Sequence, residues 1–136
     1  MEVIVHHLSG VKFEAAARGH RVVCDQPVEN HGADSGMTPP EFMLASLGTC
    51  AGYYAAEYLR TRSLPTKGLE VRVTAEKATG PARLASFRVE VTVADLDPRH
   101  EAGILRAVKA CLIHNTLTHA PAIEIALETS VPATIG

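Results

Sequence analysis

Polar and apolar positions alternate with a period of two in two stretches of the second half of the chain, a pattern typical of strands that bury one face. These stretches are residues 69–78 and 84–94, and the Gly80-Pro81 pair between them predicts a hairpin. Shorter extended runs open the chain, separated by glycine-containing turns, and a last run follows Pro121. These shorter runs predict strands over residues 2–8, 11–17, 20–25 and 122–131.

The longest apolar stretch begins at Thr38 and continues to about Ser63, and its length predicts a helix. Its first residues, Thr38-Pro-Pro-Glu41, match a capping box, in which two side chains bond the free backbone N–H groups of the helix start. No charged residue stands between Phe42 and Ala56. Such a helix is buried on most sides, and 136 residues offer little material to surround it. We therefore expect a homodimer whose long helices share a core.

A second helix is predicted from Asp97-Pro98, an N-cap residue followed by proline at the first helical position. Apolar residues then recur three and four positions apart and form one stripe: Ile104, Leu105, Val108, Cys111 and Leu112. A further short helical turn is predicted near residues 114–120. The elements follow the order βββ-α-ββ-α-β, so we predict an α+β fold that forms a single domain over residues 1–136.

Composition and charge argue against several classes of function. The chain has 13 Lys and Arg against 15 Asp and Glu, and the basic residues are scattered, so we expect no binding to nucleic acid or to a membrane. The first residues lack the basic start and long apolar run of a signal peptide, so we expect a cytoplasmic protein. Cys111-x-x-His114 lacks the second ligand pair of a zinc site, so no metal or other cofactor is expected.

Cys50 and Cys111 are the candidate reactive groups, and both lie on apolar helical faces that we expect to meet in the core. One interpretation is a pair of inert thiols that pack as small hydrophobic side chains. The other is a redox pair, in which one thiolate becomes a sulfenic acid and the second thiol condenses with it to a disulfide. Cys50 is in mid-helix, where the helix dipole does not help it, and burial raises the pKa of both thiols. A reactive Cys50 therefore needs a neighbouring cation.

Two glycines, Gly48 and Gly52, flank Cys50. A glycine in the middle of a helix costs roughly 1 kcal/mol relative to alanine. The pair therefore predicts the close approach either of another backbone or of a ligand. The third cysteine, Cys24, lies in a predicted strand and is interpreted as structural.

Two motifs carry a resemblance to a known family. The segment TPPEFMLASLGTC ends at Cys50, and the segment CLIHNTL begins 61 residues later at Cys111. Together, in this order and in these elements, they resemble the OsmC/Ohr family, the osmotically inducible and organic hydroperoxide resistance proteins. The resemblance extends over nearly the whole chain. It implies an intertwined α+β homodimer with a long central buried helix and two active sites at the subunit interface.

The resemblance also implies a function, that of a thiol-dependent peroxidase that reduces small organic hydroperoxides as an antioxidant stress response. Cys50 matches the peroxidatic cysteine and Cys111 matches the resolving cysteine. The family holds its thiolate with a glutamate, matched by Glu41, and an arginine, matched by Arg18 or alternatively by Arg21. The implied reductant is a dithiol, either a protein-bound lipoyl group or a thioredoxin-like protein.

This sequence departs from the family pattern at two further positions. Leu112 stands where proline usually follows the second cysteine, so we expect the second helix to continue for one more turn. Glu41 precedes Cys50 by nine residues rather than ten, which puts the two side chains on opposite helix faces and favours a capping role for Glu41. The nine-residue spacing and the segment LASLGTC more closely resemble the OsmC-like branch of the family. The alternative function is a non-catalytic OsmC-like dimer that binds a small apolar ligand at the subunit interface.

Overall fold

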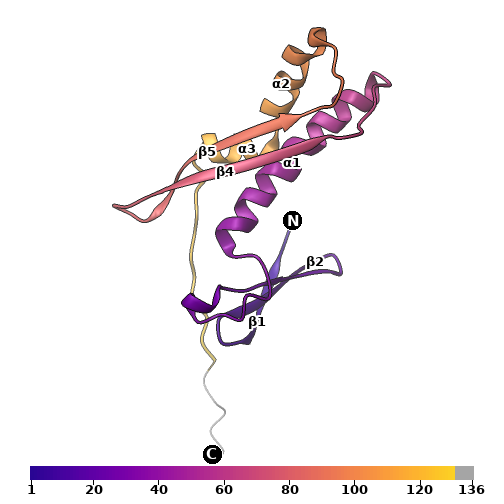
Figure 1. The fold of residues 1–136 in the computed structure, drawn as a ribbon. Coiled ribbons are helices and arrows are strands. Elements are labelled where there is room, and N and C mark those ends of the chain that lie inside the picture. Colours follow the sequence, from indigo (N-terminus) through magenta and orange to yellow (C-terminus); the bar gives the residue numbers. More distant parts are fainter. Residues whose placement is uncertain (131–136) are drawn as a thin grey trace, which may run out of the picture.

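The structure, a computed structural model that describes residues 1–130, consists of two small antiparallel sheets connected by a long helix (Figure 1). The first sheet has the strand order β1-β2-β3 and lies at the N-terminal end of the helix, and the second is the β4-β5 hairpin. All five predicted strands of these sheets are confirmed: β1 (Ile4–Ser9), β2 (Lys12–Ala17), β3 (His20–Cys24), β4 (Glu70–Ala78) and β5 (Arg83–Thr92).

The long helix is α1 (Pro39–Thr61), and its predicted capping box is confirmed. The backbone N–H of Glu41 donates to Thr38 Oγ1 at 3.5 Å. In return, Glu41 Oε1 accepts from the Thr38 backbone N–H at 3.0 Å and from the Thr38 hydroxyl at 2.8 Å. These bonds satisfy donors that an uncapped helix start leaves free, and they fix where α1 begins.

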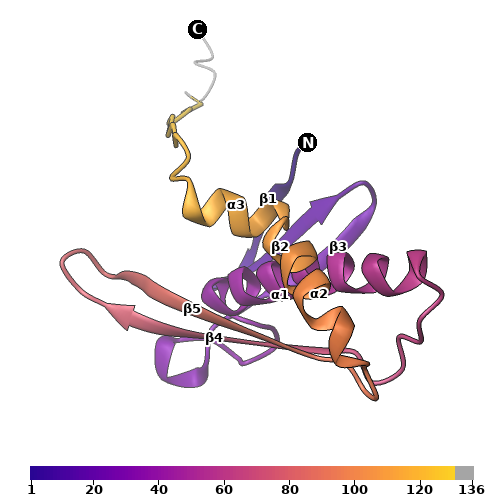
Figure 2. The same ribbon diagram turned by 90° about the horizontal axis from the view of Figure 1, so that it is seen from above.

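One stripe of α1 forms the core. Its buried residues recur every four positions, Leu47, Ala51, Ala55 and Leu59, and this face packs against β4 and against α2 (Glu101–Lys109). Figure 2 views this arrangement from above, with α2 and the hairpin beside α1. A Cβ atom at Gly48 would lie only 3.0 Å from Val73 Cγ2, so the glycine lets β4 approach the helix closely. The predicted close approach at Gly48 is therefore that of a strand of the same chain.

The second helix ends earlier than expected. A short 3-10 turn, η2 (Pro98–His100), begins after Asp97, whose Oδ1 accepts the Arg99 N–H at 3.0 Å, and leads into α2. However, α2 ends at Lys109, and a new helix, α3 (Leu112–Thr118), begins directly after Cys111. The expectation that Leu112 prolongs the second helix is wrong, because Cys111 has an extended backbone (φ −55°, ψ 130°) and acts as the N-cap of α3. The short helical turn predicted near residues 114–120 corresponds to α3.

The predicted last strand is not formed within this chain. Residues 121–130 carry no strand pairing and are exposed, and residue 131, the last of the predicted run, lies outside the described part. Figures 1 and 2 show the segment leading away from the helices. Among residues 1–130, no strand pairs with it, and its residues are exposed to solvent. In the described part of the chain, no helix is both long enough and apolar enough to cross a bilayer.

A buried carboxylate organises the loop that connects β3 to α1. Asp25 is 1% exposed, and its oxygens accept the N–H groups of Gln26, Ala33 and Ser35 at 2.8, 3.1 and 3.0 Å. The Ser35 hydroxyl also donates to it at 2.6 Å. These hydrogen bonds, above all those from Ser35, hold the pKa of Asp25 well below its usual range.

We predict that Asp25→Asn lowers the Tm and removes part of the acid sensitivity of the fold. A carboxyl with a depressed folded pKa stabilises the protein above its unfolded pKa of about 3.9, and this contribution is lost as pH falls through that value toward the folded pKa. Thermal unfolding followed by circular dichroism from about pH 6 down to about pH 3 measures the effect. The matched control is Asp34→Asn in the same loop, where the side chain is exposed. Equal effects of the two substitutions would contradict the role of Asp25.

Candidate functional site

Cys50 and Cys111 meet where the start of α3 lies beside α1. Cys50 is half-buried on α1, and Cys111 is fully buried at 0% exposure. The break between α2 and α3 turns the first N–H groups of α3 toward Cys50. The Cys111 thiol and the backbone N–H groups of Ile113 and Leu112 lie near enough to the Cys50 sulfur to lower its pKa. The structure thus brings the two predicted thiols together.

These contacts lower the pKa of Cys50. Burial by itself raises the pKa of this thiol, but the hydrogen bonds from Cys111, Ile113 and Leu112 together outweigh it. Cys50 lies in the middle of α1, and none of the groups that lower its pKa belongs to that helix. The donors belong to a different helix, and a pattern local to α1 gives no signal for them.

Cys111 has the opposite electrostatic environment. Burial raises the pKa of its thiol, and so does the hydrogen bond that it gives to the Cys50 sulfur. The backbone N–H of His114 donates to Cys111 Sγ at 3.5 Å, which only partly offsets this rise. When the pair loses one proton, it therefore leaves from Cys50, and Cys111 stays protonated.

Leu112 supplies one of the donors through its main chain. It occupies the first helical position of α3, where the backbone N–H has no partner within the helix. Proline, the residue of the family pattern at this position, has no N–H to give. The departure from the pattern therefore adds a hydrogen-bond donor to the Cys50 site, a functional contact that the sequence analysis did not foresee.

The other proposed site residues lie away from the thiols of their own chain. Arg18 is exposed in the β2–β3 turn with a positive φ of 51°, and Arg21 forms an ion pair with Glu14 at 2.6 Å. Glu41 is engaged in the cap of α1. Within the described residues, the groups that bond the Cys50 sulfur include none of these side chains.

Two further side chains border the site. Tyr54, one turn after Cys50, lines a cavity of about 500 Å³ together with Leu112, and neighbouring Tyr53 is exposed. His114, which follows Cys111 by one turn, has a buried Nδ1 atom without a hydrogen-bond partner in the described structure. Over residues 1–130, no group of three or more His, Cys, Asp or Glu side chains is placed to hold a metal ion.

Comparison with known proteins identifies the family. A family model described as OsmC-like protein matches residues 32–126, which is more than half of the chain and contains both cysteines of the site. The chain belongs to the OsmC-like protein family. The resemblance of the two cysteine motifs to OsmC/Ohr proteins is thereby confirmed. No match was found among curated proteins.

Solved structures share the fold of this OsmC-like protein at low sequence identity. An osmotic stress induced and detoxification response protein, as its name describes it, from Psychrobacter arcticus matches with a TM-score of 0.77 and 19% identity, covering 84% of this chain and 85% of that one. An OsmC-like protein from Mycoplasma pneumoniae matches with a TM-score of 0.73 and 18% identity over 88% and 87%. An organic hydroperoxide resistance protein OsmC from Legionella pneumophila matches with 0.60 and 12% over 88% and 90%.

We predict that Leu112→Pro raises the pKa of Cys50, because proline lacks the backbone N–H of Leu112 that helps to lower it. The substitution suits the backbone, since proline is favoured at the first helical position and Cys111 already has the extended conformation that a following proline requires. Iodoacetamide labelling of Cys50, located by peptide mass spectrometry across a pH series, measures the midpoint.

The matched control is Leu112→Ala, which shortens the side chain but keeps the N–H. It is expected to retain the midpoint of the parent protein. If the proline and alanine variants have the same midpoint, the Leu112 N–H does not stabilise the thiolate.

Proposed function

We propose that this OsmC-like protein is a thiol-dependent peroxidase that reduces organic hydroperoxides, with Cys50 as the peroxidatic and Cys111 as the resolving cysteine. The observation that carries the proposal is the contact between two thiols whose pKa values shift in opposite directions, down for Cys50 and up for Cys111. A reactive thiolate beside a protonated thiol is the arrangement that peroxide reduction followed by disulfide formation requires.

The proposed reaction has two steps before reduction. The Cys50 thiolate attacks the terminal oxygen of the hydroperoxide, so that an S–O bond forms, the O–O bond breaks, and an alkoxide leaves and takes a proton from water. Cys50 is then a sulfenic acid. The Cys111 sulfur attacks the Cys50 sulfur, the S–S bond forms, and the sulfenic hydroxyl leaves as water with the proton of Cys111. A dithiol, lipoyl or thioredoxin-like, is the proposed reductant that returns both thiols.

The substrate is proposed to enter beside Tyr54. The cavity of about 500 Å³ there is lined by Ala110 and Leu112, the residues on either side of Cys111, so a ligand in it would lie near the segment that carries Cys111. This volume is in the range of small-molecule sites. All three cysteines are free, which agrees with the proposed cytoplasmic location, a reducing compartment.

Arg18 and Glu41 are proposed to act at the Cys50 of a second subunit. Within one chain Arg18 lies in an exposed turn and Glu41 caps α1, so neither serves its own thiol pair. In the proposed homodimer, the two chains together would complete two sites. Each chain, residues 1–136, is proposed to form one domain.

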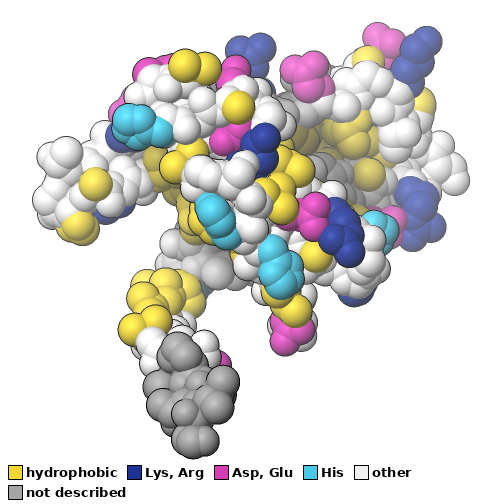
Figure 3. All heavy atoms as spheres, turned by 90° about the horizontal axis from the view of Figure 1, so that it is seen from below, with side chains coloured by type: hydrophobic (Ala, Val, Ile, Leu, Met, Phe, Trp, Pro, Cys, Tyr) yellow, Lys and Arg dark blue, Asp and Glu magenta, His cyan; other side chains and the backbone are white. Residues whose placement is uncertain are grey.

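Uncovered apolar surface supports this homodimer. Only one face of α1 is buried within the chain, and Met43 and Tyr53 elsewhere on the helix are 45% and 61% exposed. Strand β1 is exposed along its whole length. In the C-terminal segment, Ile123, Ile125 and Leu127 are 81%, 91% and 88% exposed. Figure 3 shows hydrophobic side chains both in the hollow of the lower face and on the segment that projects from it. A second chain is the partner that such a self-complementary surface favours.

The peroxidase proposal predicts that Cys50→Ser abolishes the consumption of cumene hydroperoxide in the presence of dithiothreitol. Without dithiothreitol, which would itself reduce a sulfenic acid, Cys111→Ser is expected to stop after one oxidation and leave a sulfenic acid on Cys50, which dimedone traps and mass spectrometry detects. Cys24→Ser is the control, because Cys24 lies outside the pair, and it should turn over like the parent protein.

The intact mass of the protein, measured after addition of one equivalent of hydroperoxide, distinguishes a peroxidase from a non-catalytic binding protein. Loss of two hydrogens, mapped to a Cys50–Cys111 bridge, supports the reaction. An unchanged mass would contradict it and favour the non-catalytic dimer that binds a small apolar ligand.

The homodimer proposal predicts a solution mass of twice 14.5 kDa and a shift toward the monomer in Ile125→Glu. Ile123, Ile125 and Leu127 share one face of an extended segment, and a charge there would oppose its burial against a partner. Ala126→Glu is the control, because Ala126 shares the opposite face with Glu124 and Glu128. Sedimentation at micromolar concentration measures the masses. A monomeric parent protein would exclude the dimer.

A further inference from the structure

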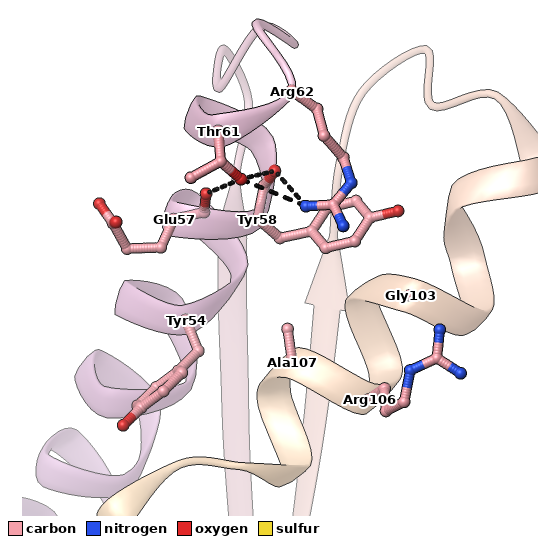
Figure 4. A pocket seen from close by; sticks show the side chains of 8 residues that line it. All are labelled: Tyr54, Glu57, Tyr58, Thr61, Arg62, Gly103, Arg106 and Ala107. Carbon is pink, nitrogen blue, oxygen red and sulfur yellow. Dashed lines mark hydrogen bonds between the residues drawn. The ribbon is translucent and has the colours of Figure 1, made fainter.

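A second cavity, of about 410 Å³, lies between the C-terminal half of α1 and α2 and shares Tyr54 with the cavity near the thiol pair, but neither cysteine lines it. Figure 4 shows its lining side chains on the two helices. From α1 and the residue after it come Tyr54, Glu57, Tyr58, Thr61 and Arg62, and from α2 come Gly103, Arg106 and Ala107. Its volume falls in the range of small-molecule sites.

The guanidinium of Arg62 is held in a fixed orientation at this cavity. It lies over the ring of Tyr58, with 3.6 Å between Arg62 Cζ and the ring centroid (Figure 4). Arg62 Nη1 donates to the Tyr58 carbonyl at 3.2 Å and to Thr61 Oγ1 at 3.2 Å. Both hydrogen bonds come from Nη1, so Nε and Nη2 remain as the pair of donors that can give two parallel hydrogen bonds to a carboxylate.

The wall that carries Arg62 is itself fixed. The Tyr58 hydroxyl is hydrogen-bonded to His100 Nδ1 at 2.9 Å. Its ring lies so close to α2 that a Cβ atom at Gly103 would come 2.5 Å from the hydroxyl oxygen. The stacking surface under Arg62 is therefore in place before any ligand arrives, which reduces the ordering cost of binding.

The two arginines of the cavity have no acidic partner among residues 1–130. The four ion pairs of this part of the chain involve neither Arg62 nor Arg106. Glu57, the acidic residue of the lining, is engaged from outside by Arg60, which donates from Nε and Nη2 to its two carboxylate oxygens at 2.8 Å each. The cavity thus combines two unpaired cations with the apolar surfaces of Tyr54 and Ala107.

We propose that this cavity binds a small organic carboxylate, whose carboxylate group accepts hydrogen bonds from Arg62 and Arg106 and whose apolar body lies on Tyr54 and Ala107. The charge pattern selects an anion, and the planar edge of Arg62 selects a carboxylate geometry. The apolar lining selects an aromatic or aliphatic body over an inorganic ion. The site does not depend on the chemistry of Cys50 and Cys111.

Benzoate tests the proposal, with benzamide as the neutral analogue of the same shape. Amide signals of the ¹⁵N-labelled protein are followed by NMR during titration at constant ionic strength. Benzoate is expected to shift the signals of Gly103 and Ala107 and to saturate, whereas benzamide is expected to bind at least about tenfold more weakly, a difference of about 1.4 kcal/mol.

Matched variants assign the effect to the two arginines. Arg62→Gln and Arg106→Gln should each weaken benzoate binding about tenfold or more. Arg60→Gln removes the same charge from the same helix, but Arg60 is paired with Glu57 and does not line the cavity, so binding should stay unchanged. The proposal is overturned if benzoate causes no saturable shift at Gly103 and Ala107, if benzamide binds equally well, or if Arg60→Gln weakens binding as much as Arg62→Gln.

Discussion

The packing of one stripe of α1 against the β4-β5 hairpin and α2 determines where the other parts of the chain lie. The stripe consists of small and medium-sized residues, with Ala51 and Ala55 between Leu47 and Leu59. Gly48, beside this stripe, allows β4 to approach α1 closely. Because α2 also packs on α1, the chain that follows α2 lies beside α1 as well. The thiol pair lies where this part of the chain meets α1, and the carboxylate-binding cavity lies between α1 and α2 nearer the end of α1.

The site shows how two chemically identical groups acquire different roles from their surroundings. Cys50 receives hydrogen bonds and Cys111 gives one, so burial, which raises both pKa values, is outweighed at Cys50 but not at Cys111. The contact between the two thiols is the largest cause that separates their pKa values, and the main-chain N–H groups of Ile113 and Leu112 lower the pKa of Cys50 further. The lowered pKa of Cys50 requires no cation from the same chain, and an arginine from a second subunit would add to a thiolate that is already favoured.

The sequence predicts well what depends on neighbours along the chain. The Thr38–Glu41 cap and the turn at Gly80-Pro81 are local, and the structure contains both. Helix propensity predicts that leucine at position 112 continues α2. The extended backbone of Cys111 instead makes Leu112 the first residue of a new helix. The donors to Cys50 could not be foreseen, since they come from residues 61 positions or more away. The last predicted strand depends on pairing with a distant strand edge, which the sequence does not reveal, and residues 121–130 pair with none of the strands described in residues 1–130.

The exposed C-terminal segment, residues 121–130, can promote aggregation as well as assembly with a partner chain. Ile123, Ile125 and Leu127 occupy every second position of a segment whose backbone groups are not paired, so the segment can pair with an open strand edge. At the high concentration of chains during synthesis, the nearest edge is that of an unfolded or misfolded neighbouring chain. Glu124 and Glu128 stand within this segment. Like charges stacked at the same register repel one another, so the two glutamates disfavour the in-register stacking of many copies while leaving a single pairing available. The apolar residues of the segment thus favour pairing with another strand, and its two glutamates oppose the stacking of many copies.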